Sequence, residues 1–155
     1  MIIRQLKLMT RSTIQKIGLG LLLILLAIQF IPVDRTIEKA EPAMDFLSQQ
    51  DSAPAAEILR AACYDCHSNE TEYPFYASIA PVSWYIQKHI NHGREHLNFS
   101  IWTSYSADDR EHILDEMIEE IEENKMPLKS YRLLHGEGRL SDGEKEQLTN
   151  WLASL

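Results

Sequence analysis

Both cysteines of this 155-residue sequence stand beside a histidine in one short segment, Cys63-Tyr64-Asp65-Cys66-His67. Two thiols at this spacing can each form a thioether with one of the two vinyl groups of a porphyrin, and the imidazole that follows can bind its iron. The spacing C-x-x-C-H is therefore typical of covalent haem c attachment. It predicts one haem, held by Cys63 and Cys66, with His67 as the proximal iron ligand.

The same cysteine pair has three alternative uses: a redox-active dithiol, a structural disulfide or half of a zinc site. A thioredoxin-like redox pair is expected near a βαβ pattern, which this sequence lacks. A structural zinc site normally needs a second pair of ligands, and no further cysteine is present to provide it. Haem attachment is therefore favoured, and a non-haem dithiol protein remains as an alternative.

The ligand on the distal side of the iron decides the chemistry, and Met126 is the leading candidate. Pro127 follows it and stiffens the loop that would present the thioether. Sulfur opposite histidine raises the potential of a haem, as in electron-carrying cytochromes. Methionine also fills gaps in cores, so Met126 could have only a packing role.

Histidines provide the alternative distal ligands. They share one stripe of a predicted helix, and we rank them His96 first, then His89 or His92. A histidine opposite the proximal imidazole would give a lower-potential haem. The stripe could otherwise hold a separate metal ion, or hydrogen-bond the haem propionates or nearby backbone.

Four helices are predicted to position these residues, which makes the folded part all-α. The first starts at Pro54 and runs into the haem motif, and Pro81 suits the first turn of the second. Ser106 and Ser141 each begin a capping-box pattern before an apolar stripe with helical spacing, which predicts the third and fourth helices. The second helix should bury one face, made of Val82, Ile86, His89, Ile90, Gly93 and Leu97.

Several segments carry a family resemblance. They are Cys63–Thr71, Tyr73-Pro74, Ile79–Trp84, Gly93–Ser100, Lys125–Leu128 and Leu140-Ser141. In these segments the chain resembles the membrane-anchored bacterial haem-binding domain family of small single-haem proteins. The order of helices, haem motif and Met-Pro loop also resembles class I c-type cytochromes. The resemblance covers about Ala55 to the C-terminus and implies haem binding by a small cytochrome c-like domain.

The N-terminal segment predicts a transmembrane helix. An apolar run from Ile17 to Val33, interrupted only by Gln29, would extend roughly 26 Å as a helix, enough to cross a bilayer. The basic residues before it favour a cytoplasmic N-terminus; they are Arg4, Lys7, Arg11 and Lys16. A cleaved signal peptide is the alternative, but no small-x-small cleavage site follows the run.

These features predict a division of the chain and a location. Residues 1–16 form a cytoplasmic basic N-terminus, 17–33 the transmembrane anchor, 34–53 a linker and 54–155 the c-type haem-binding domain. Because haem is attached to C-x-x-C-H motifs outside the cytoplasm, we expect a single-pass protein of the bacterial inner membrane. The haem domain should lie on the periplasmic side.

Charge limits the partners. The first 33 residues hold four of the 15 basic residues and none of the 23 acidic ones, so the remainder has a net charge of −12. Phosphate would repel such a domain, which excludes nucleic acid, whereas redox proteins with basic docking surfaces would be attracted. No substrate site with acid–base pairs is evident. We therefore expect an electron carrier and not an enzyme; the alternative is a haem-based sensor or peroxidase-like enzyme with an open or His-lined distal site.

Overall fold

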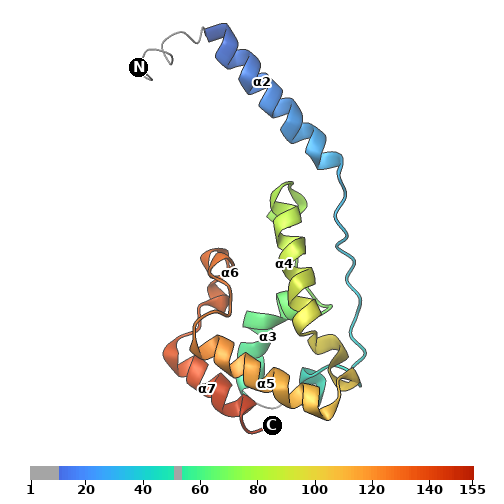
Figure 1. Cartoon of the computed structure of the whole chain (residues 1–155), viewed down its shortest axis with the longest axis vertical. Helices are drawn as coiled ribbons and strands as arrows, with labels where there is room; N and C mark the ends of the chain where they lie inside the picture. The colour runs from blue at the N-terminus through green and yellow to red at the C-terminus, as the bar shows by residue number, and fades with distance from the viewer. Residues whose placement is uncertain (1–10, 51–53) are drawn as a thin grey trace. The chain divides into compact units, whose positions relative to one another are not determined.

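The computed structural model describes residues 11–50 and 54–155, and every regular element in this part of the chain is a helix (Figure 1). The predicted all-α class is therefore confirmed. The basic residues Arg4 and Lys7 lie outside the described residues. The chain forms two compact units: one ends at Arg35 and also includes Pro74–Gln87, and the other joins Thr36–Tyr73 to Lys88–Leu155.

The first unit contains the apolar helix α2 (Arg11–Ala27), which continues into the short helix η1 (Ile28–Phe30). Thr13–Phe30 has a mean hydropathy of 1.8 with none of it buried, so its length and composition suffice to cross a membrane. Ile31 is extended, with φ −85° and ψ 107°. Proline disfavours the helical conformation in the residue before it, so the helix ends before Pro32. The apolar run continues past that point, to Val33.

The same unit includes the short helix η3 (Phe75–Ser78) and the first part of α4 (Val82–His96). Helix α4 begins one residue after the predicted Pro81. Val82, expected on the buried face, is 43 % exposed, because this end of the helix buries Ser83 instead, one position further round the helix. Ile90 and Leu97, in the second unit, are buried as predicted.

The second unit is built around α3 (Pro54–His67), α5 (Ala107–Glu122) and α7 (Asp142–Leu152), with α7 packed against both of the others (Figure 1). Leu59, Phe99 and Leu148 are fully buried at its centre. Four shorter helices complete it. They are η2 (Leu47–Gln49), η4 (Phe99–Ser104), α6 (Lys129–Leu134) and η5 (Gly136–Gly138).

Both predicted helix caps are present. The Ser106 hydroxyl accepts a hydrogen bond from the amide of Asp109, at 3.1 Å. Ser141 and Glu144 form the full capping box, with the amide of Ser141 donating to the Glu144 carboxylate at 2.8 Å. These caps satisfy amides that have no partner within the helix, which is why the sequence pattern located both helix starts.

Part of the segment expected as a linker, residues 34–53, belongs to the packed unit. Phe46 and Leu47 are only 2 % and 1 % exposed. The Phe46 ring lies 4.7 Å from that of Trp102, and its amide donates to the carbonyl of Phe99 at 3.0 Å. The core therefore includes Phe46 and Leu47, while residues 51–53 lie outside the described part of the chain.

Candidate haem-attachment site

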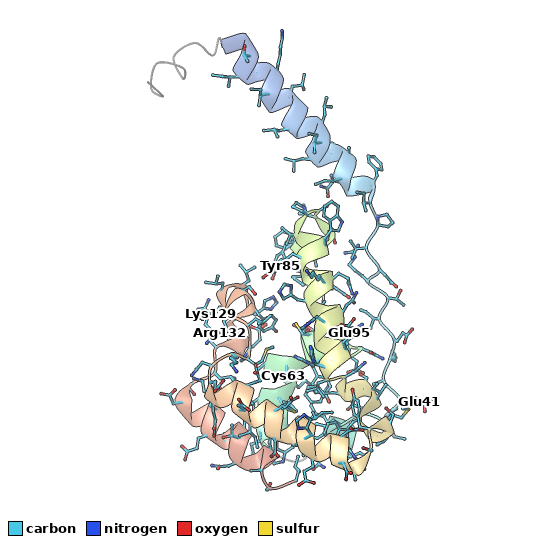
Figure 2. All side chains as sticks on the ribbon, in the orientation of Figure 1. Glu41, Cys63, Tyr85, Glu95, Lys129 and Arg132 are labelled. Carbon is cyan, nitrogen blue, oxygen red and sulfur yellow. The ribbon has the colours of Figure 1, made fainter. Side chains whose placement is uncertain are left out.

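The haem motif occupies the C-terminal turns of α3. Buried small residues, among them Ala55 and Ala56, let this helix pack closely in the core. Cys63 and Cys66 are three positions apart, so their half-buried thiols lie on the same side of the helix (Cys63 is labelled in Figure 2). His67 is the last residue of the helix, and the predicted site residues of the motif are therefore brought together by one helical segment.

The imidazole of His67 is oriented by the backbone. Its Nδ1 lies 3.1 Å from the carbonyl oxygen of Leu97, which can only accept, so Nδ1 carries the proton and donates. Burial lowers the pKa of His67 and keeps the ring neutral at neutral pH. Nε2 is then left with its lone pair, the form of histidine that binds metals.

Gly93 allows α4 to cross directly over the motif. A Cβ at this position would lie 2.9 Å from the carbonyl oxygen of Cys66 and 3.4 Å from Cε1 of His67. Backbone cannot move away as a flexible side chain could. The close approach brings the end of α4, and with it the carbonyl of Leu97, to the imidazole of His67, and it requires glycine.

The two thiols are suited to thioethers and not to dithiol chemistry. Both cysteines are free. Burial raises the pKa of Cys63 to about 12, and burial also raises that of Cys66, to about 11. Reactive and redox-active cysteines have lowered pKa values, because the thiolate is the reacting form. A thioether carries no charge and loses nothing by this burial, so the environment fits haem attachment better than a non-haem dithiol protein.

Tyr64, the first variable residue of the motif, fastens it to the core. Its ring stacks on Phe99 with centroids 4.9 Å apart. Its hydroxyl accepts from the amide of Leu47 at 3.1 Å and donates to the carboxylate of Asp45 at 3.2 Å. Burial raises the pKa of Tyr64, so the hydroxyl remains a donor. The buried carboxylate of Asp45 thereby gains a partner within the core.

Asp65, the second variable residue, binds two segments that are distant in sequence. One carboxylate oxygen accepts from the amide of Glu72 at 3.0 Å. The other accepts from the hydroxyl of Tyr131 at 2.8 Å, which holds helix α6 beside the motif. The sequence analysis did not place α6 or Tyr131 at the site. Helix α6 has only six residues, too few for a periodic pattern that would have revealed the helix.

The loop after His67 is held by Arg94. The guanidinium donates from Nε to the carbonyl of Ser68 at 2.7 Å and from Nη2 to the hydroxyl of Thr71 at 2.9 Å. The Thr71 hydroxyl in turn donates to the carbonyl of Asp65, at 2.6 Å. Arg94 is therefore a positioning residue: it fixes the loop Ser68–Thr71, which directly follows the haem motif.

The candidate distal ligands lie on different segments. Met126 is half-buried in the loop between α5 and α6, and its amide donates to the carbonyl of Glu120 at 3.0 Å. On α4, Nε2 of His92 and Nε2 of His96 are 3.4 Å apart on an exposed face, while His89 is half-buried. Among the described residues, no group of three or more His, Cys, Asp or Glu side chains is arranged to hold a metal ion.

These features fit a covalently bound haem: two neutral thiols, a neutral imidazole with Nε2 available, and a glycine where the helices meet. A family model described as a haem-binding domain matches residues 23–154. No curated protein and no solved structure matches the chain. The family match spans most of the sequence and contains the whole motif, so the chain belongs to the haem-binding domain family.

Proposed function

We propose that this protein is a membrane-anchored c-type cytochrome that carries single electrons between proteins outside the cytoplasm. The observation that carries the proposal is the hydrogen bond from Nδ1 of His67 to the carbonyl of Leu97. It fixes the imidazole in the tautomer that binds iron, beside two thiols whose burial favours thioethers over thiolates. When bound, the haem supplies a reversible one-electron change at its iron.

Each residue of the motif then has one task. Cys63 and Cys66 hold the porphyrin through thioethers, and His67 binds the iron on the proximal side. Met126 is the proposed distal ligand. It lies three residues before α6, and Tyr131 of that helix is hydrogen-bonded to Asp65 within the motif. This bond supports a Met-Pro loop close enough to the iron to complete its coordination.

Two cations on α6 are proposed to pair with the haem propionates. Lys129 and Arg132 stand one helical turn apart, so they share a face of this helix (both are labelled in Figure 2). After residue 33 the chain has 23 acidic and 11 basic residues. Two cations next to the motif already have partners: Arg94 donates to Ser68 and Thr71, and Arg60 pairs with Glu70 at 3.6 Å.

The location follows from the apolar helix. Thr13–Phe30 is proposed to cross the inner membrane, with the basic residues before it in the cytoplasm. The haem unit then lies on the periplasmic side. Its acidity supports partners with basic docking surfaces.

The direct test is an absorption spectrum of the full chain, produced in cells that mature c-type haem and purified in detergent. We expect a low-spin haem that stays on the polypeptide through denaturing electrophoresis and does not bind CO when reduced. A Cys63→Ala, Cys66→Ala double variant is the matched control and should lose the covalent haem. A wild-type chain without covalent haem would refute the proposal, and rapid CO binding would favour a sensor or peroxidase-like enzyme.

The distal ligand is tested by two matched variants, Met126→Ala and His96→Ala. If Met126 binds the iron, only the first should open the sixth position to CO and lower the reduction potential. The His96→Ala variant should keep the wild-type spectrum. The opposite pattern would assign His96 as the distal ligand, and would place the haem among the lower-potential, bis-histidine type.

A further inference from the structure

Pro74–Gln87 combines an uncharged sequence with several exposed apolar side chains. No residue in this segment is charged, whereas 25 % of the whole sequence is. Four of its residues are aromatic: Phe75, Tyr76, Trp84 and Tyr85. Aromatic side chains without neighbouring charges are typical of the zone where a bilayer meets water.

Three apolar side chains of this segment are exposed, and we call them the apolar tip. Phe75 is 81 % exposed, Ile79 is 49 % exposed and Val82 is 43 % exposed. They surround the turn between η3 and α4. Single exposed apolar residues are ordinary on soluble proteins, but a group of three without any charge between them points to an apolar partner.

The turn that carries the apolar tip is fastened to the end of the apolar helix. The side-chain amide of Gln29 donates to the carbonyl of Ala80 at 3.0 Å, and its oxygen accepts from the amide of Ala80 at 2.9 Å. Arg35 also donates to the hydroxyl of Ser78. A small cleft of about 90 Å³, lined by both segments, lies between these contacts.

These contacts set the level of the turn relative to a membrane. The 18 residues Thr13–Phe30 extend about 27 Å as a helix, close to the thickness of the hydrocarbon core. Gln29 therefore stands where the helix leaves that core. Because Gln29 pairs with Ala80, the turn lies at the same depth, and a side chain exposed there would contact lipid.

We propose that the apolar tip inserts into the lipid headgroup region beside the emerging helix, so that this unit contacts the bilayer through two segments. The inference rests on the proposed membrane anchor and is independent of the haem. Since the segment has no charge, the partner is zwitterionic lipid, held by burial of apolar surface. The contact should therefore be insensitive to salt, unlike the binding of a basic patch to anionic lipid.

The test uses the full-length wild-type protein in phosphatidylcholine vesicles that contain a phosphatidylcholine with a diazirine near its glycerol backbone. After illumination, lipid adducts are mapped by mass spectrometry. We expect adducts on Thr13–Phe30 and on Phe75–Val82, unchanged in high salt. Exposed leucines in the other unit, Leu133, Leu134 and Leu155, serve as the internal control and should carry several-fold fewer adducts.

A Gln29→Leu variant removes both hydrogen bonds to Ala80. In this variant the amount of adduct on the apolar helix should stay unchanged, whereas the amount on the apolar tip should fall several-fold. Adducts on the helix without any on the tip of the wild type would overturn the proposal and leave the anchor intact. Adducts on neither segment would overturn both, and equal labelling of the control leucines would also refute a specific contact.

Discussion

The two units of this chain use apolar side chains in opposite ways. In the haem-motif unit, Leu59, Phe99 and Leu148 are completely buried, and the polar groups around the motif are hydrogen-bonded to one another. In the unit of the apolar helix, residues such as Leu22 and Phe75 are more than half exposed. An apolar sequence alone therefore does not indicate a core. The absence of charge does not distinguish the two uses either, because Leu97–Ser106, which includes the buried Phe99, is as free of charged residues as Pro74–Gln87.

The difference is sharpest for one leucine and one phenylalanine. Leu59→Ala should lower the free energy of unfolding by about 2–5 kcal/mol, because it leaves a cavity in a closed core. Phe75→Ala should change it by less than about 0.5 kcal/mol, since this side chain is largely exposed. Urea denaturation of the haem-loaded protein in detergent, followed by tryptophan fluorescence, measures both. A comparable loss in the two variants would contradict the division.

Thiol reactivity compares the same two regions in haem-free protein. At pH 8 an ordinary thiol of pKa 9.0 is about one-tenth thiolate, but pKa values of about 11 and 12 reduce this to about 0.1 % and 0.01 %. Alkylation of Cys66 and Cys63 should therefore be roughly 100- to 1,000-fold slower than after unfolding, and should accelerate as pH rises toward 11.

A Phe75→Cys variant gives the reference for that experiment, because its thiol would replace an 81 % exposed side chain. It should react at the rate of an unfolded chain, and mass spectrometry of peptides separates the three positions. If Cys63 and Cys66 react as fast as the new cysteine, then the burial of the motif depends on bound haem.

Within the haem-motif unit, two glycines offer the next comparison. Gly93→Ala should lower the free energy of unfolding by about 1–3 kcal/mol, because the new methyl group meets the Cys66 carbonyl at 2.9 Å. Gly143 lies in α7, and a Cβ at this position would have no neighbouring atom within 4 Å. Gly143→Ala should therefore stabilise the helix by up to about 1 kcal/mol. Thermal denaturation would show the two shifts; a stabilising shift for Gly93→Ala as well would mean that α4 can move off the motif.

A modest, local effect is expected at α6, which has no buried residue of its own. Tyr131→Phe removes its hydrogen bond to Asp65 and should cost about 0.5–1.5 kcal/mol. Hydrogen exchange should quicken in Lys129–Leu134 and stay unchanged in α5. Unchanged exchange in α6 would show that other contacts hold it in place.

Local signals account for what the sequence predicted. Pro54 marks a helix start through its fixed φ, and Ser106 and Ser141 do so through bonds made within one turn. C-x-x-C-H brings its own three groups together in a single helix. The burial of Phe46 was not predicted, because two adjacent apolar residues have no periodicity and its partner Phe99 lies 53 positions away. Gly93 was placed on the inner face of its helix, but nothing in one sequence shows which carbonyl it meets.

The acceptor that orients His67 belongs to the main chain. Leu97 directly follows the last residue of α4, where carbonyl groups have no partner inside the helix. Every amino acid carries this oxygen, so no substitution at position 97 deletes it. The hydrogen bond that sets the tautomer of His67 therefore does not depend on which side chain stands at position 97; that side chain, only 7 % exposed, has a separate role in the core.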